Sequence, residues 1–412
     1  MSTLAQRRQP TNTPRRRHRP DYWLPVLATG LLSIGLIVVY SISPGMSVLQ
    51  GVSESYYISK QLIAIGLGVI AFIVLSKVPF QWWRQAVKPL IVASLIAALA
   101  VQFFGEEVNG AYRWIQVGGV SFQAAELIKF TIMVWMADFL ARRKSEGKLR
   151  DTQLTLKPLI ISLALVGIVV GVFQSDFGST AVMLGMAAAM MFMAGVPFKK
   201  LLIIGGVVMI GASLLILTSS YRRDRVATFL NPTADCQNTG YQSCQALIAV
   251  GSGGMFGLGL ARSIQAYGYL PEAANDSIFA IIAEKFGFFG VSIIVAAFAM
   301  FYSRLTKIIE CAPDDFSRIL IAGILAWFSV QAIINIGAMI GLLPLKGITL
   351  PFISYGGTSL LFVTGALGIA FQVSRYSALG SKVNEGAELP YEDSPYRRGE
   401  RRPYYTAASR RA

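Results

Sequence analysis

Long uncharged apolar stretches recur along this 412-residue chain, and they constrain its fold more than any other feature. A stretch of about 18 or more apolar residues can cross the hydrocarbon core of a bilayer as a helix. Only 14% of the residues are charged, against about 25% in soluble domains. The sequence therefore predicts an all-α polytopic integral membrane protein rather than two or three soluble domains.

Ten transmembrane spans can be drawn along the chain. They cover residues 22–43, 56–76, 86–104, 122–141, 157–174, 180–196, 201–219, 276–302, 318–341 and 358–375. Residues 22–375 then form one ten-helix transmembrane domain between two tails, 1–21 and 376–412, that are predicted to be disordered. The first span is too long for a signal peptide and lacks a convincing cleavage site, so we expect it to be retained.

The distribution of positive charge predicts the orientation of the chain. Of the 37 Lys and Arg residues, 28 lie on the side of the two tails, either in the tails and loops there or at the span ends that face them. Six lie on the opposite side, and the remaining three, Lys60, Lys129 and Lys285, lie within spans away from the tail-side ends. This asymmetry is the positive-inside signal. It predicts that the chain lies in the cytoplasmic membrane with both termini in the cytoplasm. The tails carry no nucleic-acid-binding motif, so the net charge of +15 does not predict a nucleic-acid partner.

The longest connection, about 220–275, lies on the outer side between the seventh and eighth helices. A connection of this length is more often functional than passive. Its apolar, glycine-rich run 246–260 is expected to lie at the membrane surface or dip into it. Cys236 and Cys244 lie in the same loop, where they can either form a disulfide or remain as two free thiols. No Cys/His cluster has the spacing of a zinc site, and the single histidine, His18, cannot build a Ser-His-Asp triad.

Ionisable residues within membrane spans are costly, and each is a functional hypothesis. Glu126 and Lys129 lie three residues apart in the fourth span, where they can form a structural ion pair or belong to a site. Asp176 lies in a short outer turn and can cap the following helix. Arg113 and Trp114, taken alone, are typical of a snorkelling cation and an interfacial anchor.

The strongest candidate site is the segment LPEAANDSIFAIIAEKFGFFG at 270–290, where the outer loop enters the eighth span. Glu272 and Asp276 stand at the entrance, and Glu284 follows roughly 12 Å deeper along the helix. Asp276 can serve as a helix N-cap, or it can be the partly desolvated carboxylate that a general base requires.

The last outer turn, LLPLKGITLPFISYGGTSLL, combines helix-breaking Pro and Gly residues with Lys346 and Ser354. Broken backbone at membrane depth survives only where it is buried in protein or lines a cavity. We therefore expect an outer cavity in which Lys346 and Ser354 join Glu272 as substrate-binding groups beside Asp276.

These motifs resemble those of the SEDS family (shape, elongation, division and sporulation), which are bacterial membrane-embedded peptidoglycan polymerases. The resemblance spans residues 22–375 and keeps the order of VVYSIS, NGAYRWIQVG with FQAAELIKF, QSDFGST, LPEAANDSIFAIIAEKFGFFG and LKGITLPFISYGGTSLL. The GLGLARSIQ run and the long basic N-terminal tail are more similar to the division branch of the family than to the elongation branch. Ala274 and Asn275 stand where the family often has His-Thr or His-Asn.

The resemblance implies a substrate, partners and roles for individual residues. The substrate would be lipid II, an undecaprenyl-linked disaccharide-pentapeptide, and the partners a monofunctional class B penicillin-binding transpeptidase and other divisome membrane proteins at the septum. Asp276 matches the family's essential acid, Arg113 and Trp114 its RW motif, and Lys346 the lysine of its last outer turn. Other characteristic positions are matched by Glu126, Lys129, Asp176 and Gly178.

The chemistry implied by the resemblance needs one base. Asp276 would deprotonate a sugar hydroxyl, while Lys346 and Arg113 would neutralise the departing diphosphate. No cofactor is required, and although a divalent cation (Mg²⁺ or Mn²⁺) could assist the diphosphate, the sequence has no dedicated ligand set for one. Two alternatives stay open at this stage, a lipid II flippase or transporter and a non-catalytic scaffold. The outer location of the candidate polar groups favours chemistry on an externally presented substrate over alternating access.

Overall fold

The structure is a computed structural model. It describes residues 18–108, 111–117, 120–217, 223, 227–231, 236–238 and 240–377. The predictions for most of the two tails fall on residues 1–17 and 378–412, which lie outside the described residues. So do parts of the long outer connection.

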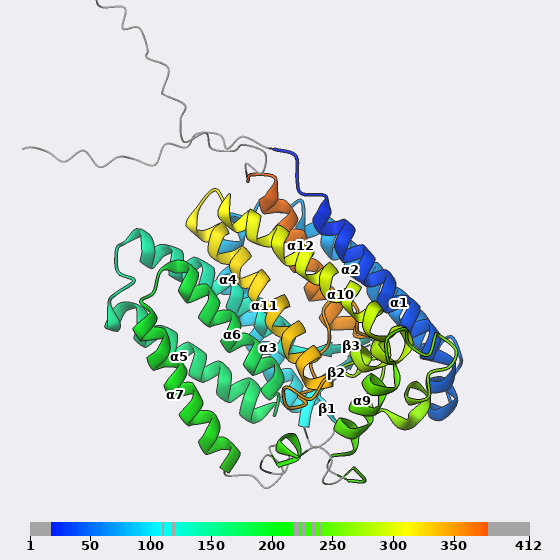
Figure 1. Ribbon diagram of the computed structural model, residues 1–412. Helices are drawn as coiled ribbons and strands as arrows, with labels where there is room; N and C mark the ends of the chain where they lie inside the picture. Colours follow the sequence, from blue (N-terminus) through cyan, green and yellow to red (C-terminus); the bar gives the residue numbers. More distant parts are fainter. Residues whose placement is uncertain are drawn as a thin grey trace, which may run out of the picture. The chain divides into compact units, whose positions relative to one another are not determined.

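Each of the ten predicted spans corresponds to a helix (Figure 1). These helices are α1 (Trp23–Gln50), α2 (Tyr56–Leu75), α3 (Trp82–Phe104), α4 (Ala124–Ser145), α5 (Lys157–Val166) between the π-helical segments η1 (Thr152–Leu156) and η2 (Gly167–Phe173), α6 (Phe177–Ala194), α7 (Phe198–Leu217), α10 (Ile278–Glu310), α11 (Asp315–Met339) and α12 (Gly357–Ser374). Within the described residues, eight helical stretches are long and apolar enough by themselves to cross a membrane. They account for eight of the ten predicted spans, and α4 and α7 correspond to the remaining two. The predicted fold class of a polytopic helical membrane protein is confirmed.

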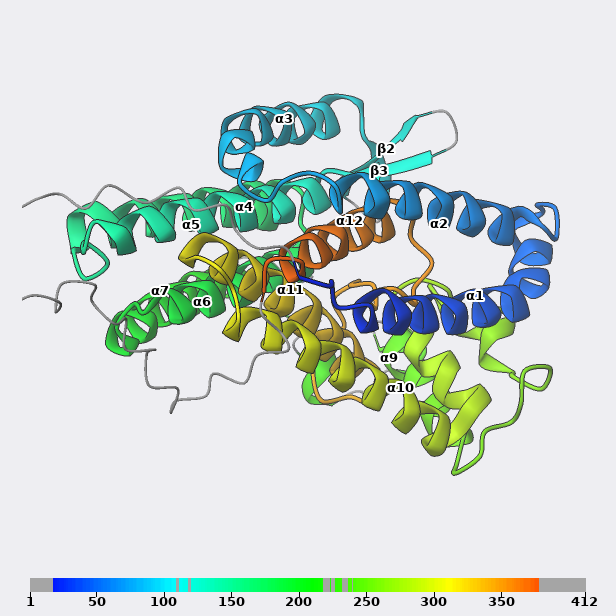
Figure 2. The same cartoon turned by 90° about the horizontal axis from the view of Figure 1, so that it is seen from above.

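The helices α11 and α12 form the centre of the bundle, and the other helices surround them. Helix α11 packs against α4, α6 and α10, and α12 packs chiefly against α2. The most apolar window of α12 is 83% buried, whereas that of α3 is only 11% buried. Apolar side chains that remain exposed on such peripheral helices are suited to contact with lipid acyl chains. Figure 2 shows α3 at the edge of the bundle, where it packs on α4.

A small antiparallel sheet lies between α3 and α4, in a segment for which the sequence predicts no regular structure. Its strands β1 (Glu106–Val108), β2 (Ala111–Val117) and β3 (Val120–Gln123) pair in the order β1-β2-β3. Trp114 pairs with Gln123, which directly precedes α4. The sheet therefore fixes the RW motif at the N-terminal end of α4.

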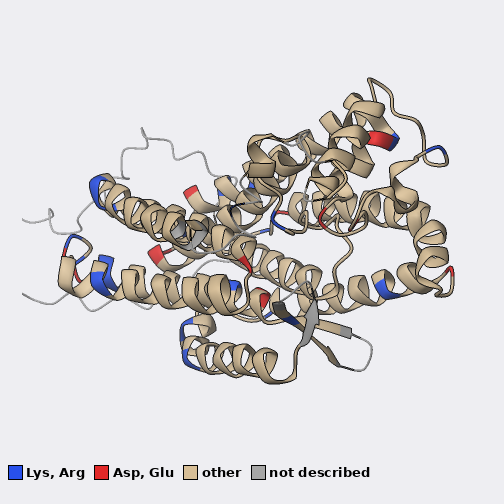
Figure 3. Ribbon diagram, turned by 90° about the horizontal axis from the view of Figure 1, so that it is seen from below, with Lys and Arg blue, Asp and Glu red and all other residues tan. Residues whose placement is uncertain are grey.

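Basic residues gather at one end of the helices, as the alternation of basic and non-basic loops predicts. Figure 3 shows blue segments at the ends of several helices on its left side. The last turn of α4, for example, carries Arg142, Arg143 and Lys144. Because cationic side chains interact favourably with the C-terminal end of a helix dipole, this arrangement stabilises α4 locally as well as marking one end of the bundle.

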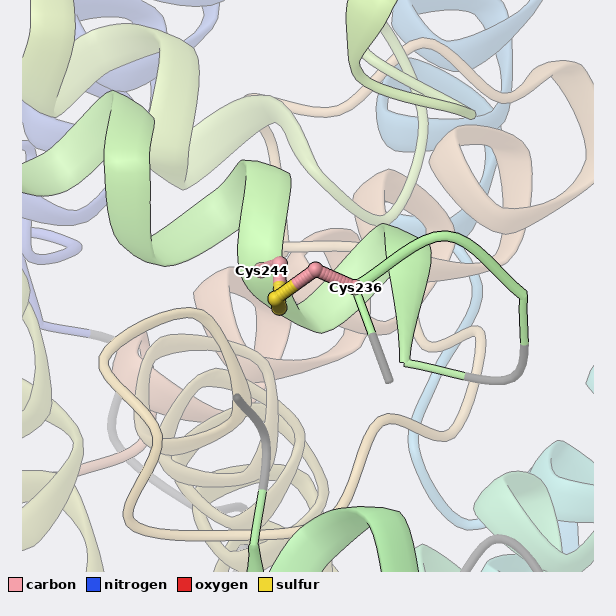
Figure 4. The surroundings of a disulfide bond; sticks show 2 residues. All are labelled: Cys236 and Cys244. Carbon is pink, nitrogen blue, oxygen red and sulfur yellow. A yellow bond between two sulfur atoms is a disulfide. The ribbon is translucent and has the colours of Figure 1, made fainter. Parts of the chain in front are cut away.

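The described part of the long connection between α7 and α10 is folded rather than irregular. It contains α9 (Tyr241–Ser252) and the short π-helical segment η3 (Gln265–Tyr269), and both pack on α10. Cys236 and Cys244 form a disulfide with Cα atoms 5.6 Å apart (Figure 4). This bond ties the chain before α9 to the first turn of that helix. Among the described residues, Cys311 is a free cysteine and is exposed.

Helix α10 is interrupted at Gly287, whose φ of 65° and ψ of −167° are not helical. This region of backbone space is essentially restricted to glycine. The interruption lets the segment around Gly257 approach closely, and a Cβ added to Gly287 would lie 2.3 Å from the Gly257 nitrogen. A side chain at this position is therefore excluded by both backbone conformation and space.

We expect Gly287→Ala to lower the free energy of unfolding by roughly 2–4 kcal/mol, because strain and a backbone clash act together. The measurement is the thermal unfolding temperature of the purified full-length protein in detergent. Gly66→Ala in α2 is the matched control, since a Cβ there meets no other atom within 4 Å. Equal unfolding temperatures for the two variants would contradict this account of the break in α10.

Candidate active site

A cavity of about 1260 Å³ collects most of the residues that the sequence singled out. Its walls come from the small sheet, the turn before α6, the segment before α10 and the turn before α12, together with α2, α5 and α7. The predicted site residues that line it are Arg113, Trp114, Glu126, Lys129, Asp176, Gly178, Glu272, Asp276 and Lys346. Residues from distant parts of the sequence thus share one surface.

Asp276 lies in the wall of this cavity and is 8% exposed. It is not the cap of α10, because that helix begins at Ile278 and its N-cap residue is Ser277. The glycine at 347 lies directly opposite, since a Cβ added there would be 3.6 Å from Oδ2 of Asp276. The carboxylate is therefore held next to the turn that carries Lys346.

Asn335 of α11 holds the two segments of the site together. Its Nδ2 donates to the backbone carbonyl of Asp276 at 2.7 Å and to that of Ile348 at 2.6 Å. Neither this residue nor Gln331, one helical turn earlier, is among the site residues predicted from the sequence. The available signal was a pair of polar side chains four residues apart, on one face of an otherwise apolar span.

Ser354 does not line the cavity, although the sequence predicted that it would bind substrate. Its hydroxyl donates to the carbonyl of Asn275 at 2.6 Å and accepts from the Leu350 N–H at 2.7 Å. The backbone N–H of Tyr355 donates to the carbonyl of Ala274 at 2.9 Å. The hydroxyl of Ser354 is thus engaged behind the wall, where it attaches the last outer turn to the segment that carries Asp276.

Lys346 is half-buried at the cavity wall, with its Nζ 5.7 Å from the centroid of the Phe177 ring. The start of α6 passes directly beneath its backbone. A Cβ added to Gly178 would lie 2.6 Å from the Lys346 carbonyl oxygen. This close approach gives Gly178 a physical role, because a larger residue would displace the turn that presents the lysine.

Arg113 and Asp176 hold the small sheet against the turn before α6. Arg113 donates from Nε to the carbonyl of Gln174 at 3.0 Å and from Nη2 to that of Ser175 at 2.9 Å. Asp176 caps α6 by accepting from the Ser179 N–H at 2.9 Å. Its other oxygen accepts from Nε2 of Gln123 at 3.1 Å. Both charged side chains therefore have structural partners while they face the cavity.

Glu126 and Lys129 form a buried ion pair at the cavity wall. The Nζ of Lys129 lies 2.8 Å from Oε1 of Glu126, and the two side chains are almost inaccessible to solvent. Gln331 lies 3.5 Å from the same Nζ, and its Nε2 donates to the carbonyl of Thr349 at 2.9 Å. The pair is thereby connected to the turn that contains Lys346.

The two glutamates near Asp276 have different environments. Glu272 lines the cavity with a left-handed backbone φ of 52°, and its carboxylate accepts from Nδ2 of Asn275. Glu284 lies outside the cavity lining and is buried against the chain before η3. It accepts from the Ser263 hydroxyl and from the backbone N–H of Ile264 at 2.8 Å. Glu284 therefore anchors the outer segment to α10.

Tyr355 also lines the cavity, where its ring packs against that of Tyr57. Burial raises the pKa of Tyr355 to about 12, and the nearby Tyr56 and Tyr57 contribute to this shift. The phenol therefore stays protonated at neutral pH and remains a hydrogen-bond donor. Among the residues that the structure describes, no three His, Cys, Asp or Glu side chains come together as a metal-binding group.

Comparison with known proteins gives consistent relatives across the transmembrane region. A family of cell cycle proteins that includes FtsW, RodA and SpoVE matches residues 22–379. A probable peptidoglycan glycosyltransferase FtsW from Coxiella burnetii is 38% identical over 366 residues, which cover 86% of this chain and 96% of that protein. The stage V sporulation protein E of Bacillus subtilis is 36% identical over 361 residues, or 87% and 98% of the two chains.

Solved structures have the same fold. A chain of a peptidoglycan synthase complex, described as coordinating polymerization and crosslinking, superposes with a TM-score of 0.72 at 24% identity. The match covers 86% of this chain and 98% of that one. The rod shape determining protein RodA of Thermus thermophilus superposes with a TM-score of 0.63 at 24% identity, over 87% and 98% of the two chains.

We expect Glu126→Gln to lower the free energy of unfolding by about 3–5 kcal/mol, because it leaves the Lys129 ammonium buried without its counter-charge. The double variant Glu126→Leu/Lys129→Met should recover more than half of this loss, since it removes both charges. Thermal unfolding in detergent is the measurement.

The matched control is Glu146→Gln at the exposed end of α4. Glu146 forms an ion pair with Arg143 at 3.0 Å. Exposed pairs contribute little to stability, so this variant should unfold close to the temperature of the unmodified protein. An equal effect of Glu126→Gln and Glu146→Gln would show that the buried pair is not important for stability.

Proposed function

The chain belongs to the family of cell cycle proteins that includes FtsW, RodA and SpoVE, and we propose that, as a peptidoglycan glycosyltransferase of this family, it polymerises lipid II during cell division. The observation that carries the proposal is Asp276 in the wall of a cavity that also holds Lys346 and Arg113. Such a cavity combines a candidate base with positive charge, which glycosyl transfer from a lipid diphosphate requires.

The proposed step forms one glycosidic bond and breaks one bond to a diphosphate. Asp276 accepts the proton of a sugar hydroxyl on one lipid-linked unit as that oxygen attacks the anomeric carbon of the other. The anomeric carbon–oxygen bond to the lipid diphosphate breaks, and its electron pair leaves with the diphosphate. Because this leaving group is already stable as an anion, one carboxylate can serve where a glycosidase uses two.

Lys346 and Arg113 are proposed to stabilise the negative charge that develops on the diphosphate. Preorganised positive groups act strongly in a partly water-excluded site, because they need no reorientation during the reaction. Arg113 is held by two backbone carbonyls, which fixes its guanidinium in place. Trp114 is half-buried beside it and would shape the wall of the cavity. A Mg²⁺ or Mn²⁺ ion bound to the diphosphate would add to the same neutralisation.

The apolar part of the cavity supports a lipid-linked substrate. The helix formed by α5 and η2 contributes a stripe of apolar residues whose spacing places them on one helical face. Helix α7 contributes a second apolar stripe. The stripe residues are Ile160, Leu163, Ala164, Gly167, Ile168, Gly171 and Val172 on the first helix, and Ile204, Val207, Val208 and Gly211 on α7. A polyprenyl chain can lie along these stripes while its sugar and diphosphate reach the polar end.

We place the reaction on the outer face of the cytoplasmic membrane, with both termini in the cytoplasm. The gathering of basic residues at the opposite helix ends supports this orientation.

A class B penicillin-binding transpeptidase and other divisome proteins are the proposed partners. The synthase complex whose chain shares this fold is described as coordinating polymerization with crosslinking.

A fluorescently tagged copy should accumulate at the septum, and uniform labelling of the side wall would instead indicate an elongation role.

A lipid II flippase is the second candidate, because a buried ion pair also faces the cavity. The two activities separate in detergent, where no second compartment exists. A polymerase given lipid II should still produce glycan strands there, whereas a flippase should release no polymer. Long glycan strands resolved by gel electrophoresis would therefore exclude transport as the sole function.

We expect Asp276→Asn to reduce the polymerisation rate by about 100-fold or more, because the amide cannot accept the hydroxyl proton. The measurement is glycan strand formation from lipid II by the purified full-length protein with its transpeptidase partner. Asp276→Asn should retain the thermal unfolding temperature, since its backbone carbonyl still accepts from Asn335.

The control for this variant is Glu310→Gln, which removes an exposed acid at the far end of α10, the helix that begins just after Asp276. It should polymerise lipid II at the normal rate. Undiminished polymer from Asp276→Asn would rule out Asp276 as the general base, and it would leave the polymerase assignment itself intact.

A further inference from the structure

Lys60 is an ionisable residue within a membrane-spanning helix, and it has no role in the reaction proposed above. It lies one turn into α2, is half-buried and lines the cavity. Its Nζ donates to the Tyr56 hydroxyl at 2.5 Å and lies 4.3 Å from the centroid of the same ring. Among the described acids, none forms an ion pair with it. An uncompensated cation in a span is costly to maintain, which indicates a functional role.

Lys60 stands at the head of an apolar stripe on α2. The residues of α2 that line the cavity are Lys60, Ile63, Ala64 and Leu67, whose spacing places them on one helical face. The stripe runs about 10 Å along the helix from the charge to Leu67. Ile63 and Leu67 are 55% and 41% exposed. A surface with a cation at one end and an open apolar face beyond it fits a lipid with an anionic head group.

This stripe is separate from the apolar walls formed by α5 and α7. Helix α2 packs on α12 and α1, and Figures 1 and 2 both show it on the opposite side of α11 and α12 from α5 and α7. The same cavity nevertheless reaches all three helices. It therefore offers two apolar walls on different sides of one polar centre.

The α2 wall is connected through Tyr355 to the segment that carries Asp276. The ring of Tyr57 packs against that of Tyr355 with centroids 5.6 Å apart, and the Tyr355 N–H donates to the carbonyl of Ala274. A phosphate held at Lys60 would thus lie in the same cavity as the candidate base. Lys346 lies by contrast against Phe177 at the start of α6.

We propose that Lys60 and Tyr56 bind the diphosphate of a polyprenyl-linked sugar whose lipid chain lies along the α2 stripe. This inference rests on the proposed function, because glycan polymerisation joins two lipid-linked units. The diphosphate at Lys346 is the one that leaves, and the diphosphate at Lys60 belongs to the unit that supplies the attacking hydroxyl. Lys60 then contributes equally to the ground state and the transition state, since its diphosphate is not cleaved in the step.

The first test compares Lys60→Gln with the unmodified full-length protein in the lipid II polymerisation assay. We expect the KM for lipid II to rise about tenfold while kcat changes less than twofold, which is the signature of lost uniform binding. Lys60→Arg should restore most of the affinity, because it keeps the charge. Lys77→Gln, at the exposed opposite end of α2, is the control and should match the unmodified protein.

A fall in kcat with unchanged KM for Lys60→Gln would overturn the proposal, since it would place Lys60 on the leaving diphosphate. Equal loss in the Arg and Gln variants would also overturn it, because charge would then be irrelevant. A thermal unfolding measurement of each variant shows whether the protein is folded. If Lys60→Gln is unstable, Lys60→Met and Lys60→Arg provide the same comparison of neutral and charged side chains.

The second test measures binding without turnover. Undecaprenyl diphosphate is titrated into the full-length protein in neutral detergent, and in a parallel arm phosphatidylglycerol is the competitor. The unmodified protein should bind undecaprenyl diphosphate at two sites, one at Lys60 and one at Lys346. Lys60→Gln should weaken one of these sites about tenfold and leave the other unchanged, and excess phosphatidylglycerol should not displace the ligand. Displacement at equal concentration would overturn the proposal in favour of a general phospholipid site.

The binding arm also separates failure of this inference from failure of the proposed function. Loss of undecaprenyl diphosphate affinity in Lys60→Gln would support the site even if the unmodified protein formed no polymer. Normal polymerisation together with unchanged affinity in Lys60→Gln would overturn the site while leaving the polymerase assignment intact.

Discussion

The double hydrogen bond of Asn335 is the interaction on which the site depends. Its amide donates to the backbone carbonyls of Asp276 and Ile348, and so it joins two segments whose backbones are not helical. In a membrane protein, broken backbone persists only where its polar groups are satisfied within the protein. Ser354 adds a second connection through the carbonyl of Asn275. The segment that carries Asp276 and the turn that carries Lys346 are therefore held as one unit.

The charges around the cavity differ in what they do for the protein. Arg113 and Asp176 hold the small sheet and the start of α6 through hydrogen bonds of their own. Glu126 and Lys129 neutralise one another in the buried wall. Because a charge that is already engaged keeps its position, these groups can give the cavity a defined electrostatic character without moving during a reaction. Asp276 and Lys346 line the same cavity.

Much of the fold and most of the candidate site could be predicted from residues alone. The ten spans follow from apolar runs that are long enough to cross a bilayer, and Asp276, Lys346 and Arg113 line one cavity as expected. The small sheet was missed because its strands are short and their pairing partners are set by the fold. Ser354 was predicted to bind substrate, because a sequence cannot show that a hydroxyl makes its hydrogen bonds to backbone groups instead.

The sequence by itself determined the class of protein, the number of spans and the gathering of positive charge at one end, because these depend on composition along a single helix and on its flanking loops. Only the tertiary structure decided which of the candidate polar groups are held as supports and which further ones join the cavity. Lys60 and Asn335 illustrate the reason. Their roles arise from neighbours supplied by distant segments, and side-chain direction and packing across helices cannot be read from spacing within one helix.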